Sequence, residues 1–249
     1  MFFKRNKELV IHCYTFDKTI YEFHKPDRAI KFVPEGWKSA PKNIPKKVFA
    51  YNPSSTMEQP NHTIKSCVGF LKLFSSGFII PSWSDILLEP QGEGAIHHSP
   101  SHLGMNESMP RDLYWNGLYP EYSHVKLLSP WVIKTDEEID FTFNSCDWNN
   151  TERASDFHVL SGVIDFKYQH CTHVNAFIKN NIHIKAGEPL AHLIPMTERK
   201  WRLEHHLVSS TDFNNILGTK ILSYTGDYTR RKKIIQENEK SKCPFGFGR

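Results

Sequence analysis

The 249-residue chain lacks three features that mark secreted and membrane proteins. It has no apolar run of about 18 residues, which a membrane-spanning helix would need. Its first residues, MFFKRNKELVIHCYTF, contain a charged block but no apolar region followed by a cleavage site of small residues, so no signal peptide is expected. The five cysteines are odd in number, widely spaced and without a CxxC pair, which argues against a disulfide framework. We therefore expect a soluble protein of a cytoplasm or a virus particle, with reduced thiols.

The chain also lacks the charge and the loops of several common function classes. Its formal net charge is only +4, which is too small to indicate nucleic-acid binding. It contains no P-loop, no G-x-G-x-x-G after a strand and no G-x-S-x-G nucleophile elbow. The basic run Arg230–Lys233 is therefore expected to be a solvated helix face. We expect neither a nucleic-acid nor a membrane partner.

Aromatic residues and turn formers are abundant. Aromatics make up 13% of the chain, which also has 15 prolines and 13 glycines. Flat and β-branched side chains pack well on a pleated sheet, so this composition favours strands separated by many turns. Short strands are predicted at 8–16, 78–81, 85–89, 125–128, 131–134, 139–144, 157–164, 173–178, 182–184 and 189–194. Their regular spacing is typical of an antiparallel sandwich or barrel.

One helix is predicted in the N-terminal half. Residues 63–75 carry apolar side chains at helical spacing, with Thr63 as a candidate N-cap and Gly77 just beyond the end. The polar, Gly-, Pro- and His-rich stretch 91–122 shows no periodicity and predicts a long loop with short strands.

Three other segments fall outside the strand pattern. Residues 23–47 contain four prolines, so they predict an extended surface segment, pinned by Phe32 and Trp37. Residues 197–207 predict a short helix, and 224–240 predict a charged one.

Two segments in the second half of the chain resemble consecutive motifs of one known superfamily. They are GVID at 162–165, followed by Tyr168, and GEPLAHLI at 187–194. They resemble the dUTP pyrophosphatase and dCTP deaminase superfamily. The resemblance implies a mainly β, β-clip or jelly-roll-like core at 78–196, which in that superfamily trimerises.

The chain would then have three parts that form one structural unit. Residues 1–77 would supply an N-terminal strand, an extended Pro-rich wrap and a helix. Residues 78–196 would form the β-clip-like core of short antiparallel strands, and 197–249 a charged helical tail.

The same resemblance assigns roles to five residues. Asp165 would position a sugar and activate water, Tyr168 would stack on deoxyribose, and Mg²⁺ would be the cofactor of such a nucleotide hydrolase. Gly162, Gly187 and His192 would complete the ligand-binding set. A structural alternative is that the two glycines only make tight turns and that Asp165 caps a turn through its side chain.

Several catalytic parts of that superfamily are missing here. No Ser-rich phosphate motif or metal-linked acidic motif is present, and the strand sequence HVNAF has no Glu to act as a deaminase's general base. The tail Phe245-Gly246-Phe247-Gly248 resembles the arm that closes over the base, but it lacks the following Ser-Thr-Gly. The pattern therefore favours the fold without the activity.

A second resemblance covers nearly the whole chain. The order IHCYTF, KPDRAIKFVPEGWKSAPK, TIKSCVGFLKLFSSGFIIPSWSDI, SPWVIKT, LSGVIDF, GEPLAHLIPMTER is similar to an uncharacterised protein family frequent in marine and cyanobacterial tailed phages. It departs from that pattern at Glu35-Gly36, where Pro-Asp is expected, and at His192, where Gln is usual. This resemblance implies a phage protein with other virion proteins as partners, and no particular activity.

Histidines offer a third reading, a metal-dependent β-sandwich enzyme. A zinc or iron site needs three or four converging ligands. The best local pair is His170 and His173, while His97-His98 with His102 and the pair His205-His206 are further candidates. Adjacent residues of a strand point to opposite faces, so an HH pair rarely chelates one ion.

The sequence therefore favours a phage-encoded, non-catalytic β protein, either an accessory virion component or a ligand- or partner-binding module. A dUTP pyrophosphatase-like hydrolase using Asp165, Tyr168 and Mg²⁺ is the first alternative, and the metal-dependent enzyme is the second. Without either alternative no cofactor is expected, and a homo-oligomer such as a trimer is the expected assembly.

Overall fold

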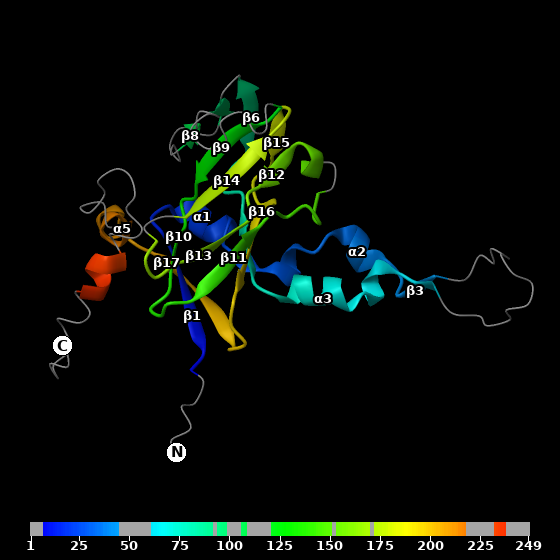
Figure 1. The fold of residues 1–249 in the computed structure, drawn as a ribbon, viewed down its shortest axis with the longest axis horizontal. Coiled ribbons are helices and arrows are strands. Elements are labelled where there is room, and N and C mark those ends of the chain that lie inside the picture. The colour runs from blue at the N-terminus through cyan, green and yellow to red at the C-terminus, as the bar shows by residue number, and fades with distance from the viewer. Residues whose placement is uncertain are drawn as a thin grey trace, which may run out of the picture.

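The structure is a computed structural model that describes residues 7–44, 61–91, 94–98, 106–108, 121–150, 153–169, 172–217 and 232–237. This part of the chain is mainly β, as predicted, and consists of several small, mostly antiparallel sheets (Figure 1). None of its helices has the length and apolar character needed to cross a bilayer.

The strands form sheets of two to five members. The five-stranded sheet has the order β13 (Gly162–Asp165), β11 (Asp140–Asn144), β16 (Pro189–Pro195), β5 (Phe78–Pro81) and β2 (Asp27–Arg28). The four-stranded sheet has the order β12 (Phe157–Val159), β14 (His173–Ile178), β9 (Ser123–Leu128) and β8 (Asn106–Ser108). The three-stranded sheets are β10 (Val132–Lys134), β1 (Leu9–Thr15), β17 (Trp201–Leu207) and β15 (Ile182–Ile184), β6 (Ile86–Gln91), β7 (Gly94–His98). The remaining pair is β3 (Asn43–Ile44) with β4 (Asn61–His62).

A single hydrophobic core joins the first part of the chain to the predicted β core. In β1 the buried Leu9, Ile11 and Cys13 alternate with less buried residues, as the two-residue period of a strand requires. They belong to the same core cluster as the inward residues of β5, β9, β14 and β16, and Trp201 and Leu203 of β17 pack against it. Residues from all three predicted parts of the chain therefore contact one core.

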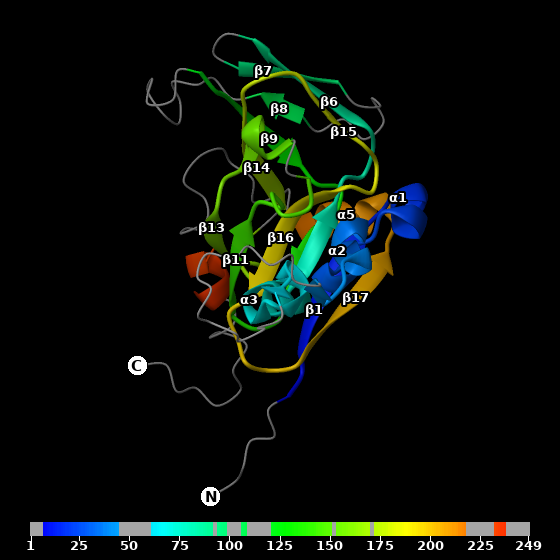
Figure 2. The same ribbon diagram turned by 90° about the vertical axis from the view of Figure 1, so that its right-hand side faces the viewer.

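The helix predicted at 197–207 is wrong. This segment contains β17, which pairs in parallel with β1 from Leu9–Trp201 to Thr15–Leu207. Figures 1 and 2 both show the two strands side by side. Pairing with a strand almost 200 residues earlier decides this conformation, because backbone groups of β1 supply hydrogen bonds that the local pattern does not reveal.

The strand predicted at 157–164 is two strands. β12 pairs with β14 in the four-stranded sheet, whereas β13 pairs with β11 in the five-stranded sheet. Between them the Leu160 amide donates to the Asn175 carbonyl, 2.8 Å away. The chain therefore changes sheets at Leu160 and Ser161, which a continuous strand could not do.

The Pro-rich N-terminal segment is less extended than predicted. It contains the 3₁₀ helix η1 (Ala29–Phe32) and the short helix α2 (Glu35–Ser39), and it follows a helix, α1 (Lys18–Phe23), that was not predicted. The two predicted pins are confirmed as contacts. Phe32 packs on a small core cluster that includes Ile79, and the Trp37 ring lies edge-on to Phe74 at 5.1 Å.

The predicted helix at 63–75 is confirmed with a break. It consists of the 3₁₀ helix η2 (Ile64–Ser66) and α3 (Val68–Ser75), and the Thr63 hydroxyl caps η2 by accepting from the Lys65 amide. In α3 only Phe74 is buried, while Val68 and Leu71 are exposed. Helices α2 and α3 lie to one side of the sheets (Figure 1).

The C-terminal part of the chain is only partly described. Helix α5 (Ser210–Leu217) was not predicted, and it buries Phe213 and Leu217 near β10. Of the predicted helix at 224–240, residues 232–237 are helical and the others lie outside the described residues, as does the tail Phe245–Gly248. The predicted loop at 91–122 is described only in β7, in β8 and at its two ends.

Candidate functional site

A cavity of about 540 Å³ opens beside β13 and is the candidate functional site. Its walls come from two sheets, because β11 and β13 belong to the five-stranded sheet while β9 and β14 belong to the four-stranded one. Its polar lining includes His124, Asp140, Asp165, Gln169, His173 and Asn175. Phe143, Leu160 and Ile164 supply apolar surface. Such a mixture of apolar wall and convergent polar groups is typical of small-molecule sites.

Asp165 is a buried carboxyl residue in the wall of this cavity. It ends β13 directly opposite Asp140 of β11, and it is only 3% exposed. Its Oδ1 accepts from the Lys167 amide at 2.9 Å, which confirms the predicted turn-capping contact. Its Oδ2 is buried without a hydrogen-bond partner in the described part of the chain. Burial raises the pKa of this carboxyl, and the nearby charge of Glu138 raises it further.

Tyr168 does not share the cavity with Asp165. Its side chain is buried, and its hydroxyl donates to Glu138 Oε2 at 3.1 Å. The Lys167 and Lys232 ammonium groups lie 5.5 and 5.0 Å from its ring centroid. The ring is not part of the cavity wall, so it is not placed to stack on a sugar bound beside Asp165.

The other three expected ligand residues are dispersed. Gly162 lines the cavity, but it begins β13 and makes no tight turn. The alternative that this glycine only makes a tight turn is therefore wrong. Gly187 does make a turn, with φ of +83°, but away from the cavity. His192 is buried in β16, where its Nε2 lies 2.7 Å from the Ser76 carbonyl oxygen. The cavity therefore brings together Gly162 and Asp165 only.

The predicted metal-binding histidines are also separated. His173 lines the cavity, while His170, His102 and the side chains of His97 and His98 lie outside the described residues. His205 and His206 face opposite sides of β17, as their adjacency predicts. His205 Nε2 lies 2.7 Å from the Pro26 carbonyl oxygen, whereas His206 lies beside His12 of β1.

Within the described ranges, one group of three side chains has ligand atoms close enough to hold a metal: His12, Glu204 and His206. Sequence reasoning missed it because His12 is distant in sequence from the other two. The available signal was the spacing of Glu204 and His206, which puts both on one face of a strand.

Two buried histidines make the stability of the fold depend on pH. Burial lowers the pKa of both His124 and His192, and neither side chain is more than 1% exposed. The unfolded chain therefore takes up protons more readily than the folded one. The stability that depends on the two neutral histidines is fully present above about pH 6.5 and decreases as the pH falls below it. Each histidine contributes a slope of up to about 1.4 kcal/mol per pH unit.

We expect urea unfolding at pH 5.5 to show lower stability than at pH 7.5. His192→Gln, which can still donate to the Ser76 carbonyl, should reduce this slope. A slope identical in wild type and His192→Gln would contradict this assignment.

No protein-family model matches the chain, and no curated protein matches it at a significant level.

Proposed function

We propose that this chain is a non-catalytic, ligand-binding β protein whose cavity beside β13 takes a small neutral or cationic ligand. The observation that carries the proposal is the buried Asp165 Oδ2, an acceptor without a hydrogen-bond partner in the described chain, at the wall of a 540 Å³ cavity. A buried polar atom of this kind is costly unless something pairs with it. A ligand hydroxyl or amine would supply the missing donor once a rotation of the side chain turns this oxygen, which water does not reach in the free protein, toward the cavity.

The charge of the lining favours this class of ligand over a nucleoside triphosphate. Asp140 and Asp165 both line the cavity, and the described lining contains no Lys or Arg. A triphosphate would therefore meet two carboxylates without a balancing cation from the wall, and like charges at short range repel. A sugar, a polyol or an amine has the hydrogen-bond donors without the negative charge.

A nucleotide hydrolase of the dUTP pyrophosphatase class is the second candidate, and one observation favours it. Asp165 lies at the cavity with a raised pKa, as a general base near neutrality would need. Its partner in that resemblance, Tyr168, lies outside the cavity wall. Turnover of dUTP with Mg²⁺ would support this candidate against the non-catalytic one.

A ligand panel tests the proposal. We expect thermal shifts from at least one class among monosaccharides, polyols and polyamines, confirmed by calorimetry, and neither a shift nor pyrophosphate release with dUTP or dCTP. Asp165→Asn should weaken the binding of any ligand that gives a shift by at least about tenfold, which is the scale of one hydrogen bond to a charged group. Binding by none of the three classes would contradict the proposal.

Asp165→Asn is suited to this test because it should not unfold the protein. Asparagine keeps an oxygen for the Lys167 amide and removes a charge that burial disfavours. Since the raised pKa means that the ionised carboxylate destabilises the fold at neutral pH, we expect unchanged or higher stability. Chemical denaturation of the free protein checks this, and a large loss of stability would show that the carboxylate is structural.

The resemblance to tailed-phage proteins supports a place for this module in a phage particle or an infected cell. Mass spectrometry of purified virions would distinguish these two locations. The trimer implied by the other resemblance also belongs to the proposal, and light scattering of the purified chain measures it.

A further inference from the structure

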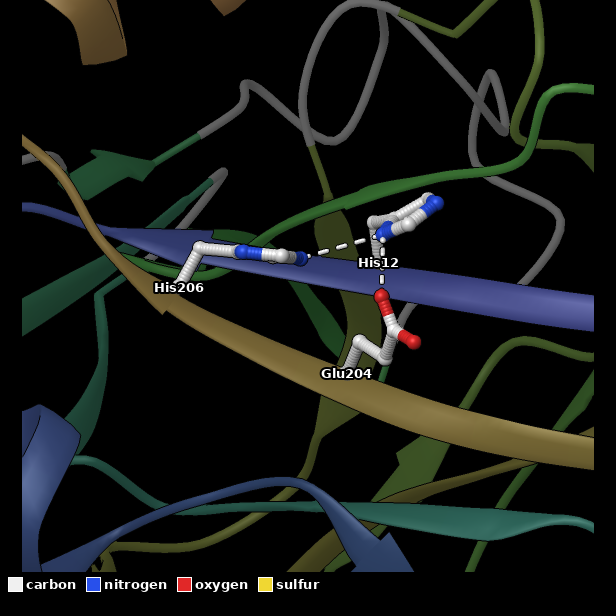
Figure 3. A group of neighbouring side chains, drawn as sticks. All are labelled: His12, Glu204 and His206. Carbon is white, nitrogen blue, oxygen red and sulfur yellow. Dashed lines mark hydrogen bonds and ion pairs between the residues drawn. The ribbon is translucent and has the colours of Figure 1, made fainter.

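Three side chains from strands far apart in the sequence converge on the outer face of the β1–β17 pair. His12 of β1 is the Cα partner of Glu204 of β17, and His206 is two residues further along the same strand. Because alternate residues of a strand share a face, all three side chains project to one side. Figure 3 shows both rings and the carboxylate directed toward a common point.

The distances within this group suit a metal ion. His12 Nδ1 lies 3.0 Å from His206 Nε2 and 3.5 Å from Glu204 Oε2, and the three ligand atoms all lie within 4.8 Å of one another. Two ligands that each bind zinc at about 2.0–2.1 Å with tetrahedral angles are about 3.3 Å apart. The two separations from His12 Nδ1 bracket that value, and the third is at most 4.8 Å, so rotations of the side chains would let them enclose an ion.

The surroundings hold the ligands in position and keep them accessible. The Tyr14 ring stacks on the His206 ring with centroids 4.6 Å apart. Arg202 pairs with Glu204 Oε1, so the oxygen that faces His12 is the other one, Oε2. The Lys134 ammonium group of β10, the strand on the other side of β1, is already hydrogen-bonded, because it donates to the Gln169 carbonyl. The side chains of His12 and Glu204 are 18% and 35% exposed, which leaves a path for an ion.

We propose that His12, Glu204 and His206 form a binding site for a divalent transition-metal ion, of which Zn²⁺ is the best match. Imidazole is a borderline ligand that suits zinc and its neighbours, so two imidazoles beside one carboxylate favour these metals over Mg²⁺ or Ca²⁺. Three protein ligands leave a fourth position for water. This site is separate from the cavity beside β13, and it does not depend on the function proposed for that cavity.

The ion would link β1 to β17, which are the first and the last strands along the described chain. His12 and His206 are separated by 194 positions, so metal binding would close a very long loop. Since an ion that binds only the folded chain stabilises it, Zn²⁺ should raise the thermal midpoint. The stabilisation should be specific to variants that keep all three ligands.

The test uses the full chain without an affinity tag, stripped of metal with a chelator. We expect calorimetric titration to show one equivalent of Zn²⁺ bound, accompanied by a higher thermal midpoint. Co²⁺ should give visible absorption of a tetrahedral or five-coordinate site, without the thiolate charge-transfer band that binding at the exposed Cys67 would produce. Magnesium should not compete.

Substitutions at the three ligands decide the assignment. His12→Ala and His206→Ala should each weaken Zn²⁺ by more than the roughly 10–100-fold typical of losing an outer-shell partner. Glu204→Gln, which preserves shape, gives the same readout if an alanine variant fails to fold. The control is His183→Ala, an exposed strand histidine in another sheet, which should bind as wild type does. Wild-type affinity in the folded ligand variants, or no binding by the wild-type chain, would overturn the proposal.

Discussion

Replacing Gly77 with alanine is expected to destabilise this protein by about 3 kcal/mol or more, because two costs add. Gly77 precedes β5 with φ of +69°, a left-handed conformation that costs an L-residue about 1–2 kcal/mol. A Cβ at this position would also lie 2.0 Å from the Leu193 carbonyl oxygen and 2.9 Å from the Ile194 Cα. Both atoms belong to the backbone of β16, so no side-chain rotation can relieve the overlap.

The measurement is the urea midpoint of Gly77→Ala against wild type. The matched control is Gly36→Ala, because Gly36 lies in α2 and a Cβ there would meet nothing within 4 Å. Alanine is favoured over glycine in a helix by up to about 1 kcal/mol, so this control should be neutral or stabilising. Equal midpoints for Gly77→Ala and wild type would contradict the close contact between Gly77 and the backbone of β16.

The second large effect is expected at Trp131, the largest fully buried side chain of the described structure. Its indole Nε1–H donates to the His24 carbonyl at 2.9 Å and so joins the end of α1 to the start of β10. Its ring also meets His205 edge-on at 5.7 Å. Truncation to alanine would leave a large cavity and an unpaired carbonyl, and should cost about 3–5 kcal/mol.

Two further tryptophan variants separate the contributions to this loss. Trp131→Phe keeps most of the apolar volume and removes the hydrogen bond, so its cost should be smaller, about 1–3 kcal/mol. Trp37→Ala truncates a half-buried tryptophan of α2, outside the main core, and should also cost less than Trp131→Ala. An alanine variant at Trp131 as stable as that at Trp37 would contradict the central position of this ring.

The strands that were predicted correctly are those whose own sequence contains the determining signal. Residues 8–16 alternate because one face of β1 meets the core, and FIIP at 78–81 is apolar throughout because β5 is buried on both faces. The Thr63 cap and the end of the helix just before Gly77 were also predicted, since each depends on the chemistry of one residue.

The candidate site could be predicted only in part. The resemblance on which Asp165 and Tyr168 were selected concerns neighbours in sequence, and the structure places one at the cavity and buries the other against Glu138. A separation of three residues at the end of a strand does not determine which side chain faces a cavity. That depends on how the sheets holding β11 and β14 pack together.

Local sequence is enough to predict the mainly β class, the position of most strands and the end of a helix before Gly77, because local periodicity and single-residue signals encode them. Three features emerge only from the folded chain: residues 201–207 form a strand, β12 and β13 belong to different sheets, and His12 meets His206. The physical reason is the same for all three. Contacts between residues distant in the chain depend on strand pairing and packing, and these leave no periodic signal in either partner alone.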